Sequence, residues 1–139
     1  MSQIADALGA APNAVAVALL ARAVRRAWPA AAAVDGWWWV DGGARRRAVA
    51  TDGRIADAVA ALEASDAGAG ARTSVVVADL SSIALDEAVL HLEAPVLALG
   101  RATGDGAWLT LSGDDVPHGA VAALGRVAEA LAAPVRLLV

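Results

Sequence analysis

The chain contains no cysteine, no lysine, no phenylalanine and no tyrosine among its 139 residues. The absence of cysteine excludes disulfides, thiolate nucleophiles and Cys-ligated metals. All 11 basic residues are arginines, a bias that is typical of a GC-rich bacterial genome. Because Cys, Lys and Tyr are all absent, few general acids and bases remain, and the composition favours a binding role over catalysis.

The charge and the hydropathy pattern exclude further classes of partner. The formal net charge is −4 and the sequence pI is about 5.0, which argues against a nucleic-acid binder with a concentrated basic surface. The apolar stretch 14–20 is too short to cross a bilayer, and Arg22 interrupts its continuation. The N-terminal residues lack a basic region followed by an apolar run, so we expect no signal peptide, no membrane partner and a cytoplasmic location.

Hydrophobic periodicity predicts a single α/β (or α+β) domain over residues 1–139, with an N-terminal helical segment 1–28 and a sheet-and-helix body 30–139. Helices are expected at 13–28 (capped by Asn13), at 54–65, at 81–94 (where a strand is the alternative), and from Asp114 or Asp115 to Pro134. Strands are expected at 30–35, 37–41, 44–50, 74–80, 96–99, 107–111 and 135–139. These strands predict a mixed sheet of about five to seven strands with helices packed on it.

Two details of this prediction concern burial and repetition. The continuous Val run of the strand 74–80 indicates burial on both faces, with a helix covering each side nearby. The order hairpin, helix, strand in 37–80 recurs in 96–139, which would fit a duplicated unit. On the helix 13–28, Arg22, Arg25 and Arg26 lie off the apolar stripe, which favours a solvated face over an anion site.

Three adjacent tryptophans and three adjacent arginines form the strongest candidate binding surface. Side chains alternate along a strand, so Trp37 and Trp39 would share one face and Trp38 would occupy the other. Glycines at 42 and 43 predict a hairpin that pairs this strand with a return strand. Guanidinium–indole stacking within the hairpin and a surface for a ligand or protein partner are the two alternatives. Trp and Arg are enriched at interfaces, so we expect a self-associating, dimeric binding or scaffold module that uses Trp37, Trp38, Trp39, Arg45, Arg46 and Arg47.

Other residues offer weaker chemistry. The glycine-rich segment 100–106 is followed by a strand rather than a helix, which favours a hairpin over a phosphate loop. His91 and His118 lack ligand-type neighbours at useful spacing, so we expect no metal and no cofactor. The carboxylates at 114 and 115 are best explained as helix caps. An alternative enzyme would use backbone amides near the turn and the helix start that follows, at Gly104, Gly106, Asp114, Asp115 and His118.

Two family resemblances bear on function. Residues 95–116 look like the crotonase segment, in which a Pro-led strand precedes a glycine-rich turn that supplies an oxyanion amide. This resemblance implies a small or degenerate enzyme acting on an acyl or small polar ligand, since the chain lacks the loop with the second oxyanion donor. Residues 87–132 resemble the C-terminal half of roadblock/LC7 domains, which implies a dimeric scaffold acting with GTPases.

Overall fold

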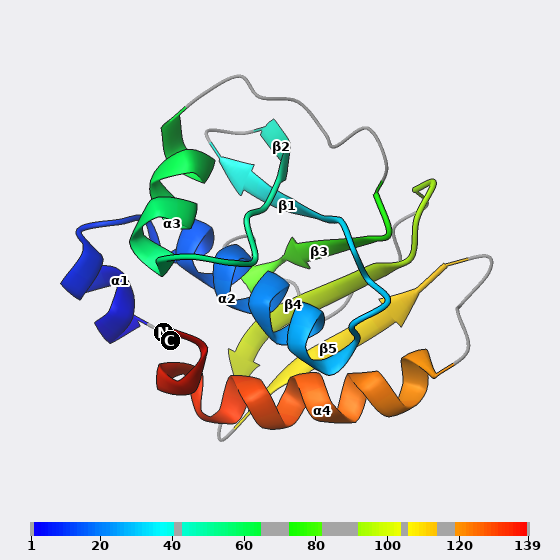
Figure 1. The fold of residues 1–139 in the computed structure, drawn as a ribbon. Coiled ribbons are helices and arrows are strands. Elements are labelled where there is room, and N and C mark those ends of the chain that lie inside the picture. The colour runs from blue at the N-terminus through cyan, green and yellow to red at the C-terminus, as the bar shows by residue number, and fades with distance from the viewer. Residues whose placement is uncertain are drawn as a thin grey trace.

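In the part of the chain that the structure describes, a five-stranded mixed sheet and four α-helices form a single α/β domain (Figure 1). The computed structural model describes residues 2–40, 43–64, 73–81, 92–103, 106–113 and 119–138. The helices are α1 (Ser2–Leu8), α2 (Pro12–Ala27), α3 (Ile55–Ala64) and α4 (Ala120–Ala132), followed by a 3-10 helix (Pro134–Leu138). The strands are β1 (Val34–Val40), β2 (Gly43–Ala48), β3 (Val75–Asp79), β4 (Val96–Thr103) and β5 (Gly106–Ser112). The predicted fold class is thereby confirmed.

The sheet has the strand order β2-β1-β3-β4-β5. Its three central strands are parallel, and each edge strand pairs antiparallel with its neighbour. Both predicted hairpins are present, as β1–β2 and β4–β5. All five residues of β3 are buried, as the Val run predicted, because β3 is the middle strand of the sheet.

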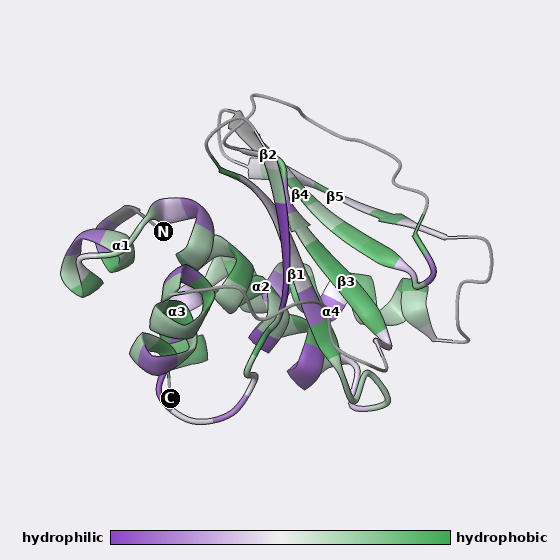
Figure 2. Ribbon diagram, turned by 90° about the horizontal axis from the view of Figure 1, so that it is seen from above, coloured by the Kyte–Doolittle hydropathy of each residue, from purple (hydrophilic) through white to green (hydrophobic). Residues whose placement is uncertain are grey.

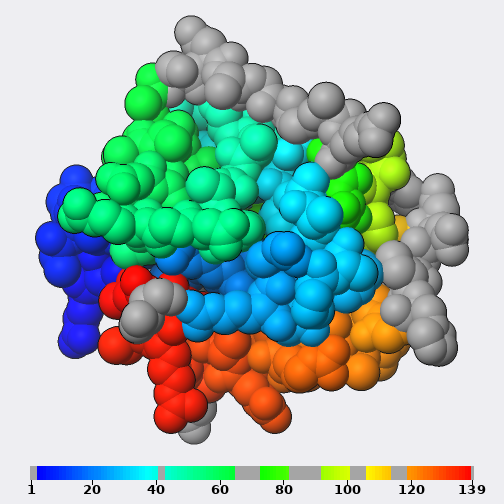
Figure 3. Space-filling view, in the orientation of Figure 1, coloured from blue at the N-terminus to red at the C-terminus, as the bar shows by residue number. Residues whose placement is uncertain are grey.

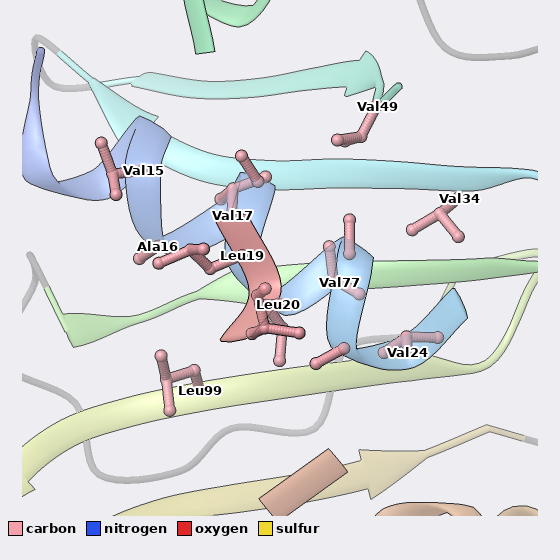
Figure 4. Packing of buried hydrophobic residues seen from close by; sticks show 14 of the residues in the cluster. Val15, Ala16, Val17, Leu19, Leu20, Val24, Val34, Val49, Val77 and Leu99 are labelled. Atoms are coloured by element: carbon pink, nitrogen blue, oxygen red, sulfur yellow. The ribbon is translucent and has the colours of Figure 1, made fainter. Parts of the chain in front are cut away.

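Helix α2 lies at the centre of the molecule, and 12 of its 16 residues are buried. Pro12 begins the helix at a position where its missing N–H costs nothing, and the helix ends before Pro29. Its Val and Leu side chains pack against Val34 on β1, Val77 on β3 and Leu99 on β4 (Figure 4). Alanines at most of the remaining positions allow neighbouring backbones to approach closely.

All four described helices lie on one side of the sheet (Figure 2). Helices α2 and α4 pack against each other, and α3 packs against α2. The other face of the sheet carries a second buried cluster that contains Val76, Ala78, Val96 and Ala98. The expectation of a helix on each side of β3 is not met within the described residues, and the predicted helix 81–94 lies mostly outside them, at 82–91.

The predicted strands 30–35 and 37–41 are separated at Gly36, but β1 runs through this residue without interruption. A Cβ atom at this position would lie 2.3 Å from Val17 Cγ1 and 3.0 Å from Val49 Cγ2. Gly36 therefore permits the close approach of α2 to the sheet. The residues before β1, at 30–33, do not belong to a strand.

The predicted terminal strand 135–139 is wrong, because Pro134–Leu138 forms a 3-10 helix. Its Leu137 is 1% exposed and packs into the main core, and the Leu137 carbonyl accepts a hydrogen bond from Arg22 Nη1 at 3.5 Å. Burial of one leucine fixes this segment against α2 and α4 rather than in the sheet. The second half of the suggested duplication consequently lacks its strand.

Two predictions about α2 are also wrong. Ala11 rather than Asn13 occupies the N-cap, and its backbone N–H donates to Glu63 Oε1 at 2.7 Å. Arg22 is 3% exposed instead of solvated. Its Nη2 donates to the carbonyls of Asp52 at 3.4 Å and Gly53 at 2.7 Å, so the guanidinium joins α2 to the loop before α3.

Candidate functional site

The three adjacent tryptophans of β1 have different environments. Trp38 is 2% exposed and belongs to the core beneath the helices. Trp37 lies on the opposite face, where it packs against the second buried cluster. Trp39 shares that face and is 38% exposed, and its ring centroid lies 6.4 Å from that of Trp37 at an interplanar angle of 55°. Of the three indoles, Trp39 is therefore the one most available to a partner.

Arg46 is held by carboxylates within the chain. It lies opposite Trp37 on the face away from α2, and its Nε donates to Asp35 Oδ2 at 2.9 Å. Its Nη1 donates to Glu93 Oε2 at 3.0 Å, and its Nη2 pairs with Glu93 Oε1. The Thr73 hydroxyl donates a further hydrogen bond of 2.9 Å to Asp35 Oδ2. This network joins β2, β1 and the segment before β4.

The network changes the acidity of its members. The hydrogen bonds from Arg46 lower the pKa of Glu93 to about 2. The same contacts raise the pKa of Arg46, chiefly through Glu93. Glu93 is 62% exposed whereas Asp35 is 1% exposed, so the Asp35–Arg46 bond is the one shielded from solvent. Arg46 therefore has a structural role that does not require a ligand.

Arg45 and Arg47 lie on the other face of β2, opposite Trp38 and Gly36. Arg45 lines a small hollow of about 150 Å³ together with Asn13, Trp38 and Glu63. Among the described residues, no guanidinium stacks on these indoles, and the ring contact is between Trp37 and Trp39. The binding role of the six predicted residues stays a prediction, and the structure divides them between two faces of the sheet.

The edge strand β5 offers a surface that the sequence prediction did not single out. Trp108 is 55% exposed. Leu109 and Leu111 point toward the helices and pack against the main core, so Trp108 and Thr110 project from the opposite face. No residue of Gly106–Ser112 is charged. The sequence does contain a signal for this surface, because Trp108 stands in an uncharged segment that follows a glycine-rich turn.

A buried carboxyl group lies at the carboxyl end of β3. Asp79 is 0% exposed, and its Oδ1 accepts hydrogen bonds from the Ser81 backbone N–H at 3.1 Å and the Ser81 hydroxyl at 2.6 Å. Its Oδ2 is buried and has no hydrogen-bond partner among the residues that the structure describes. Burial raises the pKa of Asp79, and the bonds from Ser81 lower it less strongly. The sequence could not reveal this, since an aspartate that ends a strand is ordinarily solvated.

The residues of the alternative enzyme prediction are only partly described. Gly106 begins β5 and pairs with Thr103, so it belongs to a hairpin rather than to the start of a helix. Gly104, Asp114, Asp115 and His118 lie outside the described residues, as does His91. Within the described ranges, no group of three or more His, Asp or Glu side chains could hold a metal ion.

The comparisons with known proteins assign no family. No protein-family model matches the chain, and no curated protein matches it in sequence. Across the described part of the chain, no helix has both the length and the apolar character needed to cross a membrane. The function must therefore be argued from the surfaces of this fold.

Proposed function

We propose that this chain is a small cytoplasmic binding module that self-associates through the exposed edge of β5. The supporting observation is the contrast between the two edge strands of the described sheet. β5 has no charged side chain and exposes Trp108, whereas β2 carries Arg45, Arg46 and Arg47 in succession. Charged edge strands resist pairing, and uncharged edges with exposed apolar side chains favour it.

The expected occupant of this edge is a second copy of the chain. If β5 of one copy pairs antiparallel with β5 of a second copy, the contact is two-fold symmetric, and both copies contribute the same strand. Exposed backbone N–H and C=O groups would form the ladder between the copies. Trp108 and Thr110 lie on the same face, and aromatic and β-branched side chains stabilise each other across paired strands.

The Trp and Arg residues predicted from the sequence lie on β1 and β2, away from the proposed β5 contact. Trp38 belongs to the core, and Arg46 is held by Asp35 and Glu93. Trp39 is exposed on the same face of the sheet as Trp108, but β3 and β4 lie between β1 and β5, so Trp39 lies outside the β5 contact. Among the described residues, no specific observation favours the enzyme alternative: its one described residue, Gly106, lies within a paired strand.

The test is molar mass by light scattering with size-exclusion chromatography, measured over a range of concentrations. We expect the parent chain to have twice its mass of 13.9 kDa at high concentration. Trp108→Arg should yield a monomer, since in a symmetric contact the arginine of one copy would meet the same arginine of the other copy and repel it. Val121→Arg is the matched control: Val121 is 78% exposed on α4, and this variant should remain dimeric. A monomeric parent, or a Trp108→Arg variant that remains dimeric, would contradict the proposal.

A further inference from the structure

Five of the 11 arginines gather around the C-terminal half of α2, although the chain as a whole is acidic. Arg22, Arg25 and Arg26 belong to α2, Arg126 belongs to α4, and Arg136 belongs to the C-terminal 3-10 helix. These three elements contact one another and adjoin on the side of the molecule shown in Figure 3. Segments that are about 100 residues apart in sequence thus bring guanidinium groups together.

A hollow of about 330 Å³ lies between these elements. Among the described residues, Arg26, Arg126, Arg136 and the carboxylate Glu129 line it. Its apolar part comes from alanines, of which Ala130 is the least buried, next to the buried Leu137. Three guanidiniums and one carboxylate give the lining a formal charge of +2, opposite in sign to the net charge of the chain. The volume lies at the lower end of the range for small-molecule sites, about 300–1,000 Å³.

Two of the guanidiniums are fixed in place by backbone carbonyls. Arg126 Nε and Nη2 both donate to the Ala27 carbonyl, at 3.2 and 3.0 Å, and thereby cap the C-terminus of α2. Arg26 Nη1 donates to the Arg136 carbonyl at 2.5 Å. These bonds leave Arg126 Nη1 without a hydrogen bond among the described residues, and the Arg136 side chain makes no hydrogen bond or ion pair there. Arg126 is thus a preorganised guanidinium with a donor to spare, which suits it to recognition of an oxyanion.

The geometry points to a binding site for a small organic anion that carries a phosphate or carboxylate group, held by Arg126 and Arg136 with its apolar portion against Ala130. A capping role alone explains the bonds of Arg126 and Arg26, since cations stabilise a helix C-terminus. Capping does not explain Arg136, which adds a third positive charge to the hollow without a partner for its side chain among the described residues.

The test is isothermal titration calorimetry of the full chain with inorganic phosphate, pyrophosphate and citrate at constant ionic strength. We expect at least one of these anions to bind with a Kd of about 1 mM or lower. Arg136→Gln should weaken that binding about tenfold or more. The thermal stability of the unliganded chain should not change, because the Arg136 side chain makes no bond within the described residues.

Arg54→Gln is the matched control, since it removes an exposed arginine that lies outside the hollow. It should leave the affinity unchanged. Stronger binding of pyrophosphate than citrate would identify a phosphoryl ligand, and the reverse would identify a carboxylate ligand; either supports the site. The site is refuted if none of the three anions binds with a Kd of about 1 mM or lower, or if Arg54→Gln and Arg136→Gln weaken binding equally.

Discussion

The close contact between α2 and β1 at Gly36 allows the packing argument to be tested by a double-mutant cycle. In Gly36→Ala the new Cβ would lie 2.3 Å from Val17 Cγ1, whereas carbon atoms in contact are ordinarily about 3.5–4.0 Å apart. Val17 is 0% exposed and lies between fixed backbone segments of the helix and the sheet, so it cannot move aside without displacing other core atoms. We expect the substitution to lower the free energy of unfolding by about 3 kcal/mol, at the upper end of the usual cost of overpacking.

The second arm of the cycle removes the obstructing atom. Val17→Ala deletes two buried methyl groups and should cost about 2 kcal/mol. In the double variant the methyl group added at position 36 would occupy space that Val17 Cγ1 vacated, so the total cost should be about 2 kcal/mol rather than the sum of about 5. Gly125→Ala is the matched control, because a Cβ there meets nothing within 4 Å, and it should stabilise α4 by about 0.5–1 kcal/mol.

The assay is urea unfolding followed by tryptophan fluorescence at a fixed protein concentration, because self-association would change the apparent stability. A loss of about 3 kcal/mol corresponds to a midpoint shift of about 1–3 M urea at the usual slopes. Two outcomes would refute the claim that the missing side chain at Gly36 makes room for Val17. In one, the losses of the two single variants add up in the double variant; in the other, Gly36→Ala is as stable as the parent.

Three further predictions concern single side chains, each read as a free energy of unfolding. Trp38→Ala should cost about 3–5 kcal/mol because the indole is 2% exposed, whereas Trp39→Ala should cost less than about 1 kcal/mol; equal losses would contradict the assignment of faces. Arg46→Ala should cost about 3 kcal/mol, since it leaves the Asp35 carboxylate buried with one fewer partner, while Arg45→Ala should cost little. The raised pKa of Asp79 means that the folded chain holds this proton more tightly than the unfolded chain. Its contribution to stability is therefore fully present below the unfolded pKa of about 4 and is lost as the pH rises toward the folded value. Unfolding of the parent and Asp79→Asn between about pH 4 and pH 7 should show the parent losing stability relative to the variant; parallel pH profiles would contradict this.

Local sequence determined the type and approximate position of most elements. The Val run of β3 indicated burial on both faces, and all five of its residues are buried. Glycines after β1 indicated the first hairpin, and the predicted helix 13–28 differs from α2 by one residue at each end, with Pro29 bounding its C-terminus. These features could be predicted because turn chemistry and hydrophobic periodicity act over a few residues.

Tertiary structure alone decided which predicted site residues face the core. Alternation separated Trp38 from Trp37 and Trp39, but the buried side depends on where α2 packs, which no property of β1 specifies. From the sequence, Arg22 looks like a surface residue. In the fold its guanidinium instead bonds to the carbonyls of Leu137 and Gly53, which are 115 and 31 residues away in the sequence. From the sequence, Gly36 looks like a strand breaker. In the fold, Val17 of α2 occupies the space where a side chain at position 36 would lie. In each case the deciding partner is distant in sequence, and only packing in three dimensions brings it into contact.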